Sequence, residues 1–329
     1  MSNLNIIHLT QKSGLLTKLH SDTIMGHFCW RFKEHHGAEQ LDAFCLEYAQ
    51  APIFTISDGL GVYDGKLFFP KPEYISEYKP SPKEKKAKVQ QFIDTKDLKG
   101  LKYTDAAGLN LFLSGKIEEY EAHLKNMKEK EVKTPSFTQG LRVSVTIDRA
   151  QMKSLDGGLY SYAPQYPEFA EGDKDKKTSQ AILVRIYNQK RFDELKVADL
   201  LKEVFETGFG KKKSVGYGAF ECGEFKEYTE LKEPDNANGF LTLGHYTPTG
   251  VDGLIAGYYN HNIKYGRLGE ERANNPNPFK KPILSFSPGS CFTVNKVKEW
   301  YGLVTDGVVE GEKNIWHFGV PLTLGAMIP

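Results

Sequence analysis

A stretch of glycines and lysines is the part of this sequence best suited to bind an anion. Gly-Phe-Gly at 208–210 and Gly-Tyr-Gly at 216–218 are separated by five residues, three of which are lysines. Glycine permits positive φ angles and close backbone approach, so the N–H groups of such a turn can face an anion. Lysine adds a point charge that suits phosphate. The pattern predicts a polyanion-binding loop, rather than only a glycine-rich turn with solvated lysines.

The elements on either side of this loop argue against a nucleotide-binding enzyme. Apolar residues recur at helical spacing before it, so 195–206 is predicted as an amphipathic helix that ends at Gly208. Residues 217–225 are predicted as a strand. The order is therefore helix, loop, strand, whereas Rossmann and P-loop sites run strand, loop, helix. The spacing also fits neither motif, since Lys213 stands where a third glycine is required.

Candidates for acid–base catalysis are present without a motif around them. Histidine is the most frequent general acid or base in enzymes, and five histidines are available early in the chain: His8, His20, His27, His35 and His36. Asp22 is a candidate aspartate, although Ser21 or Asp22 also suits the N-cap of a helix that runs to about Lys33. No Ser-His-Asp arrangement follows from the sequence order. We therefore predict no catalytic residue.

Cysteine spacing and composition exclude several other classes of protein. The four cysteines are scattered without a Cys-x-x-Cys pair, which argues against a zinc site or a disulfide scaffold and fits a reducing cytosol. We predict no metal and no cofactor. The 329 residues are 40% hydrophobic and 26% charged, with a net charge of only +1, so any basic surface must be local. No signal sequence or long apolar run is present, which predicts a cytoplasmic protein without membrane contact.

The first 225 residues follow the element order of a ferredoxin-like domain. Strands are predicted at 3–9, 53–56, 66–69, 141–149 and 181–187, together with the two helices and the final strand at 217–225. Without insertions this gives the βαββαβ order, which is also the platform of RNA-recognition motifs. The first domain is predicted at 1–228.

Two insertions are predicted within this domain. Residues 73–135 carry charge runs at 83–88 and 125–133 around weakly periodic helical segments, so we expect a solvated helical insertion without a site. Residues 149–180 are predicted as a long hairpin that stands out from the sheet, with a polar tip at 171–177.

The C-terminal part is predicted to be a second, smaller domain. Residues 226–238 are charged and contain proline, as expected of a linker. Short strands are predicted at 239–245, 283–286, 291–294 and 315–318. We interpret 229–329 as an irregular ferredoxin-like domain. The fold class is therefore α+β, with tandem ferredoxin-like (RRM-like) domains.

The glycine–lysine loop resembles the glycine-rich loop of RAMP proteins, the RNA-binding subunits of CRISPR effector complexes. Their pattern is Gly-hydrophobic-Gly, five residues with at least one basic, then Gly-hydrophobic-Gly; Phe209 and Tyr217 fill the hydrophobic positions. The His-Ser-Asp-Thr segment that begins at His20, the stretches 53–72 and 141–162, and more loosely the C-terminal part, are similar to the Csm-type handle-binding subunit of type III-A complexes. The hairpin at 149–180 resembles the RAMP thumb.

This resemblance implies a non-catalytic subunit that holds the 5′ repeat-derived handle of CRISPR RNA. Its partners would be the large polymerase-like subunit and the backbone RAMP subunits, with target RNA met only indirectly. The RNA-binding residues that we predict combine the loop with basic and polar residues elsewhere: His20, Ser21, Arg142, Arg149, Lys153, Gly208, Phe209, Gly210, Lys211, Lys212, Lys213, Ser214, Gly216, Tyr217 and Arg267.

A RAMP endoribonuclease is the alternative. In the enzyme that processes CRISPR RNA, the glycine-rich loop lies close to the C-terminus, whereas more than a hundred residues follow it here. In the backbone subunit that cleaves target RNA, an aspartate of an early loop acts, and Asp22 is the comparable residue. We favour the binding subunit because Asp22 suits a helix cap better.

Overall fold

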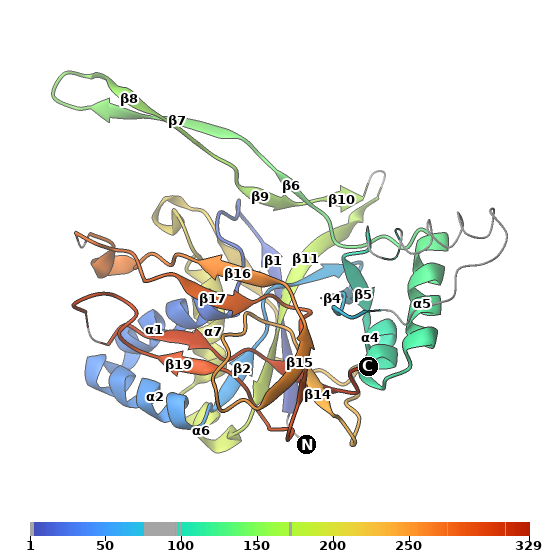
Figure 1. The fold of residues 1–329 in the computed structure, drawn as a ribbon. Helices are drawn as coiled ribbons and strands as arrows, with labels where there is room; N and C mark the ends of the chain where they lie inside the picture. Colours follow the sequence, from blue (N-terminus) through green and yellow to red (C-terminus); the bar gives the residue numbers. More distant parts are fainter. Residues whose placement is uncertain are drawn as a thin grey trace.

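A computed structural model gives the fold (Figure 1) and describes residues 3–75, 96, 98, 100–170, 173–274, 276–312 and 314–329. Its centre is an antiparallel sheet in the order β12-β1-β11-β3-β4-β5, with β13 on β1 and with β2 and β10 on β11. The strand bounds are β1 (Asn3–Gln11), β2 (Phe54–Ile56), β3 (Leu60–Tyr63), β4 (Lys66–Pro70), β5 (Tyr103–Asp105), β10 (Phe169–Ala170), β11 (Asp173–Ile186), β12 (Phe220–Cys222) and β13 (Lys226–Glu227).

Four helices pack against the large sheet in one hydrophobic core. They are α1 (Ser21–His36), α2 (Ala38–Gln50), α6 (Gln189–Glu194) and α7 (Val197–Glu206). Their apolar faces pack with one face of β1, β2 and β11 in a single cluster of buried side chains. The chain runs β1-α1-β2 and then β11-α7-β12, and the neighbours in space are β12, β1, β11 and β2. This is the strand order that a βαββαβ unit gives.

The region predicted as a solvated insertion differs from that expectation where it is described. α4 (Ala106–Leu113) and α5 (Ile117–Glu129) pack against the sheet, and Leu109, Phe112 and Leu124 are fully buried. The charge run at 125–133 lies at the end of α5, while the apolar face of the same helix is in the core. The charge run at 83–88 lies outside the described residues.

The projecting hairpin lies earlier in the chain than predicted. Its stem is β6 (Phe137–Gln139) with β9 (Gln165–Pro167), and its arms are β7 (Arg142–Asp148) and β8 (Lys153–Tyr162), which stand away from the body (Figure 1). The turn is at 149–152, where we placed the start of the hairpin. The sequence alternates as in a half-buried strand, yet Val143, Val145 and Ile147 are all exposed. Residues 173–180 already belong to β11.

The C-terminal part forms smaller antiparallel sheets. One has the order β15-β18-β14-β21, with β14 (Gly239–Thr242), β15 (Leu254–Tyr258), β18 (Cys291–Val294) and β21 (Thr323–Ala326). Two ribbons pair β16 (His261–Lys264) with β17 (Ile283–Phe286), and β19 (Leu303–Thr305) with β20 (His317–Gly319). Between 239 and 329 the described residues contain a short 3-10 turn, η2 (Glu270–Asn274), but no α-helix. The α+β class is confirmed, whereas a second ferredoxin-like unit is not.

The two parts share a core and a fixed connection. Leu4 and Leu183 of the large sheet lie in one buried cluster with Leu241 and Leu324 of the C-terminal sheet. The stretch predicted as a linker is anchored, because Glu233 forms an ion pair with the buried Arg185 and β13 pairs with β1. Among the described helices, none has the length and apolar character that a membrane crossing requires.

Candidate nucleic-acid interface

The glycine–lysine loop connects α7 to β12, as the sequence predicts, and contains a short 3-10 turn, η1 (Lys213–Val215). Phe209 is fully buried, with its ring 5.9 Å from Phe205 and 4.7 Å from His27. Phe209 therefore anchors the loop in the core, which corrects its prediction as an RNA contact. Gly208 is buried beside it, while Lys211, Ser214 and Gly216 are exposed.

The glycines of this loop are required by its backbone. Gly208, Gly210, Gly216 and Gly218 all have φ between 72° and 100°, a region that other residues rarely occupy. A Cβ at Gly218 would lie 2.0 Å from the carbonyl oxygen of Phe209, and one at Gly210 would lie 2.4 Å from Thr17. The two Gly-x-Gly pairs thus close the loop on itself.

Most backbone N–H groups of the loop bind within the protein, contrary to the expected anion cradle. Gly210 N–H donates to His27 Nε2 at 3.1 Å, and Lys211 N–H donates to Thr17 Oγ1 at 2.9 Å. Phe209 N–H donates to the carbonyl of Gly218 at 2.8 Å. A glycine-rich sequence predicts accessible N–H groups but cannot reveal which of them the rest of the chain uses. The capacity to bind phosphate therefore lies mainly in the lysine side chains.

Two tyrosines of the hairpin complete this surface. Lys212 Nζ lies 4.7 Å from the ring centroid of Tyr160 and 4.2 Å from that of Tyr162. The ring of Tyr217 meets Tyr162 edge-on at 5.6 Å, and their hydroxyls are 3.3 Å apart. We did not predict Tyr160 or Tyr162 as site residues. Their signal is the two-residue spacing in a strand, which places both rings on one face.

Basic side chains gather at this surface. Arg142 is exposed and lies opposite Tyr162 in the hairpin. Hydrogen bonds to Tyr217 and Ser144, together with the charges of Lys212 and Arg142, lower the pKa of Tyr162. Aromatic faces beside cations form the usual surface for single-stranded nucleic acid, where bases stack and phosphates meet the charges.

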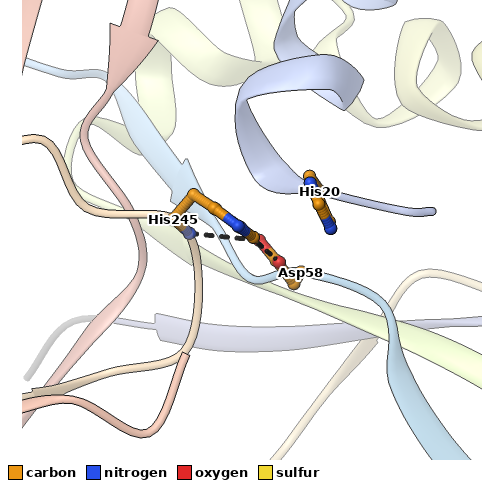
Figure 2. Close-up of side chains that lie close together, drawn as sticks. All are labelled: His20, Asp58 and His245. Atoms are coloured by element: carbon orange, nitrogen blue, oxygen red, sulfur yellow. Dashed lines mark hydrogen bonds and ion pairs between the residues drawn. The ribbon is translucent and has the colours of Figure 1, made fainter. Parts of the chain in front are cut away.

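A second polar cluster lies at the N-terminus of α1, where the C-terminal part meets the large sheet (Figure 2). Asp58 Oδ1 accepts a hydrogen bond from Ser21 N–H at 2.8 Å, and Asp58 Oδ2 accepts one from His245 Nδ1 at 2.7 Å. His245 N–H donates to Ser21 Oγ at 3.0 Å. The helix is thus capped from a distant turn, and not by its own Ser21 or Asp22. Ser21 is 2% exposed, so its prediction as an RNA contact is wrong.

His20 stacks on His245 at the edge of this cluster, with ring centroids 3.9 Å apart. Burial lowers the pKa of His20 to about 4, although Asp58 opposes this shift. Burial also disfavours ionisation of His245, but the charge and hydrogen bond of Asp58 prevail and raise its pKa. Burial raises the pKa of Asp58, and the opposing effect of His245 holds it below the usual value. At neutral pH, His20 is therefore a neutral imidazole stacked on His245, which is hydrogen-bonded to Asp58.

Asp22 lies in a separate ion pair. Lys264 Nζ is 2.7 Å from Asp22 Oδ1 and 2.8 Å from Oδ2, and it donates to Thr23 Oγ1 at 2.5 Å. Burial opposes the ionisation of Asp22, but the charge and hydrogen bond of Lys264 lower its pKa to about 2. Asp22 therefore links α1 to β16 as a carboxylate that is already neutralised.

Known structures share this fold. One is a crystal structure of a Csm3-Csm4 subcomplex in the type III-A CRISPR-Cas interference complex. The match covers 98% of this chain and 99% of the matched chain, with 17% sequence identity and a TM-score of 0.62. Structures of a Csm1-Csm4 cassette with AMPPNP and with cA4 each match 99% of both chains, at 15% identity and a TM-score of 0.59. The chain shares the fold of subunits found in these Csm complexes. No protein-family model and no curated protein sequence matches it.

This fold brings together some of the predicted site residues and separates others. Lys212, Tyr217 and Arg142 converge at the root of the hairpin. Arg149 and Lys153 are exposed at the tip of the hairpin. Arg267 lies beyond β16, with its guanidinium 5.9 Å from the ring of Phe279. The predicted RNA-binding residues therefore include one compact surface at the hairpin root and two more distant places, the hairpin tip and Arg267.

Among the residues that the structure describes, one group of side chains could hold a metal ion. The possible ligand atoms of His20, Asp58 and His245 all lie within 4.8 Å of one another. However, both carboxylate oxygens of Asp58 already accept hydrogen bonds from the protein. The arrangement serves the fold as it stands. Sequence reasoning missed this cluster, because Asp58 and His245 are 187 residues apart.

Proposed function

We propose that this chain is a non-catalytic RNA-binding subunit of a type III-A (Csm) CRISPR effector complex. It binds the 5′ repeat-derived handle of the CRISPR RNA and joins the large polymerase-like subunit to the backbone RAMP subunits. It meets target RNA only indirectly and acts in the cytoplasm.

The observation that supports this proposal is the surface at the hairpin root. Lys212 lies over the faces of Tyr160 and Tyr162, and the side chains of Lys211 and Arg142 are exposed nearby in the loop and hairpin. Tyrosines stack on bases of any sequence, and lysines bind phosphates. A double helix would bury its bases, so this surface suits a single strand. The repeat-derived handle is such a strand.

The proposed partners rest on the structural neighbours. Their descriptions name complexes of Csm4 with Csm3 and of Csm4 with Csm1. A chain with the same fold over its full length presents the same arrangement of elements to a partner.

The test is to recover RNA with the protein from its native cell. A tagged chain, expressed at its normal level, should co-purify short RNAs that share one 5′ end derived from the repeat. A matched variant with Lys211, Lys212 and Lys213 all changed to alanine should recover much less of them. Recovery of RNA with scattered 5′ ends, or of none by the wild type, would contradict the proposal.

One observation favours the alternative of a RAMP endoribonuclease. The imidazole of His20 lies beside the Asp58–His245 pair, and a neutral histidine is a possible general base. Against this, Asp22 is neutralised by Lys264, and His245 Nδ1 is occupied by Asp58. We expect no cleavage when the protein is incubated with repeat RNA or target RNA, with or without Mg²⁺. Cleavage that disappears in His20→Ala or His245→Ala would support the endoribonuclease instead.

A further inference from the structure

Two side chains from the beginning of the chain hold the glycine–lysine loop just before its second lysine. Thr17, which precedes α1, accepts a hydrogen bond at Oγ1 from Lys211 N–H at 2.9 Å. His27, within α1, accepts one at Nε2 from Gly210 N–H at 3.1 Å. These acceptors are 194 and 183 residues away from their donors in the sequence. Two consecutive backbone N–H groups of the loop are therefore bound by side chains of a distant segment.

The residue that follows these two N–H groups has a backbone conformation that lysine rarely adopts. Lys212 has a φ of 62° and a ψ of 24°, in the left-handed region where a Cβ is crowded. A residue stays in this region only where the surrounding structure holds it, and such residues are concentrated at functional sites. In this conformation Lys212 Nζ lies over the rings of Tyr160 and Tyr162. The loop backbone is thus held in the form that places this lysine over the hairpin.

Thr17 and His27 each combine a hydrogen bond with a packing contact. A Cβ at Gly210 would lie 2.4 Å from Cβ of Thr17, so the threonine side chain lies directly against the loop backbone. The ring of His27 lies 4.7 Å from that of Phe209. Because His27 Nε2 accepts a hydrogen bond, the imidazole is the neutral tautomer with its proton on Nδ1. Substitutions that keep the shape but remove the acceptor can therefore separate the two contributions.

The far end of the loop is fixed by other groups. Gly218 N–H donates to the carbonyl oxygen of Gly14 at 2.9 Å. Ala219 N–H donates to Ser13 Oγ at 3.0 Å. Loss of the acceptors at Thr17 and His27 should therefore leave the loop attached and the protein folded, while residues 210–212 gain freedom.

We propose that Thr17 and His27 are positioning residues for RNA binding, which hold Lys211 and Lys212 in place before the RNA arrives. A loop that is already ordered loses less conformational entropy when it binds a ligand. The inference rests on the proposed function and assigns to it two residues that act through the lysines. The net effect of one such hydrogen bond on an equilibrium constant is roughly 2- to 10-fold.

Fluorescence anisotropy with a single-stranded 12-nucleotide RNA tests this role. Thr17→Val removes the hydroxyl and keeps the shape, and His27→Phe removes the acceptor and keeps a ring against Phe209. Each should weaken binding by roughly 2- to 10-fold. Thr17→Ser and His27→Gln retain an acceptor and should restore most of the affinity. Thr247→Val is the matched control, because its hydroxyl shares a hydrogen bond with His317 in the C-terminal part.

Two further readouts distinguish positioning from a direct contact or a general loss of stability. The slope of log K against log salt concentration should stay as in the wild type, because all the lysines are still present. In the RNA-free protein, hydrogen exchange followed by NMR should show faster exchange of the released N–H group, by roughly 2- to 10-fold. That group is Lys211 N–H in Thr17→Val and Gly210 N–H in His27→Phe.

The outcomes separate this inference from the proposed function. If Thr17→Val and His27→Phe bind RNA like the wild type, or if Thr17→Ser and His27→Gln bind as weakly as they do, the acceptors do not position the lysines, while RNA binding stands. A smaller salt slope in His27→Phe would mean that a charged imidazole contacts phosphate itself, which also contradicts the inference. If the wild type binds no RNA, both the inference and the proposed function are wrong.

Discussion

The hairpin root and the N-terminus of α1 use similar side chains in opposite ways. At the hairpin root, Tyr160 is 45% exposed, and Lys212 Nζ lies over its ring and 3.4 Å from its hydroxyl. At α1, Asp58 and His245 are 7% and 5% exposed, and hydrogen bonds join them to each other and to Ser21. One region leaves its polar groups available to a ligand, whereas the other uses them to join two parts of the chain.

This difference separates binding from structural roles among residues that look equally functional in the sequence. A buried polar group needs partners to offset its desolvation, so a fully bonded cluster indicates a contribution to the fold. An exposed cation over aromatic rings contributes little to folding and is available to bind. We therefore expect changes at α1 to alter stability, and changes at the hairpin root to alter RNA affinity alone.

The largest effect is expected from Asp58→Ala. This change leaves the imidazole of His245, whose pKa is raised by Asp58, and the N–H group of Ser21 without their acceptor, while His245 N–H keeps Ser21 Oγ. Loss of one partner of a buried ion pair costs about 3–5 kcal/mol. Urea denaturation should record that loss in the free energy of unfolding, while Asp156→Ala, on the exposed strand β8, should change it by less than about 0.5 kcal/mol. Equal effects of the two changes would contradict the structural role of the cluster.

Removal of one tyrosine ring from the hairpin root should act on binding instead. Tyr160→Ala and Tyr162→Ala should each weaken binding of a single-stranded 12-nucleotide RNA by about 1–3 kcal/mol, because each loses a stacking face. Tyr160→Phe and Tyr162→Phe keep the ring and should bind nearly as the wild type does. Tyr259→Ala, at an exposed position of the C-terminal part, is the control. Fluorescence anisotropy measures the affinities, and an alanine variant that binds like its phenylalanine counterpart would count against stacking.

Acidification should weaken the junction at α1. Burial lowers the pKa of both His20 and His317 to about 4, from 6.5 in the unfolded chain. Between these values the unfolded chain binds more protons, so the free energy of unfolding decreases as pH falls below 6.5. From pH 6.5 to 5 the loss should be about 1–2 kcal/mol per histidine. The raised pKa of His245 does not oppose this, because its contribution is already complete below pH 6.5.

Urea denaturation at pH 6.5 and 5 checks this expectation. The depressed pKa values of Asp22 and Asp58 matter only below this window, so they do not confuse the result. His317→Gln removes one of these histidines and should reduce the pH dependence. A free energy of unfolding that is constant between the two pH values would show that these histidines are not held neutral.

Sequence patterns predicted the elements whose form depends mainly on neighbouring residues in the chain. The amphipathic face of 195–206 and the glycines after it located α7 and the loop. The strands at 283–286 and 291–294 match β17 and β18, because each is a short apolar run between turn residues. The failures concern contacts between distant residues. Nothing near Ser21 reveals that Asp58 caps α1, or that Thr17 and His27 occupy the N–H groups of the loop.

The hairpin shows a second limit of pattern reasoning. Alternation of Val143, Val145 and Ile147 indicates a strand with one buried face, and the strand is correct. The face is exposed, since no element of the body covers it among the described residues (Figure 1). The opposite error occurred at α4 and α5, where charges suggested a solvated region and the apolar faces form part of the core. The periodicity of a single sequence shows which residues share a face, but not whether another element packs against that face.

The most direct test of the central claim is the salt dependence of RNA binding when Lys211, Lys212 and Lys213 are all changed to alanine. Each phosphate contact with single-stranded RNA contributes a slope of about −0.7 to log K against log salt concentration. The triple variant, confirmed as folded, should therefore show a slope smaller by up to about 2, with a similar loss of affinity for handle and scrambled RNA. An unchanged slope and affinity would mean that the lysines are only solvated, and that this loop does not bind RNA.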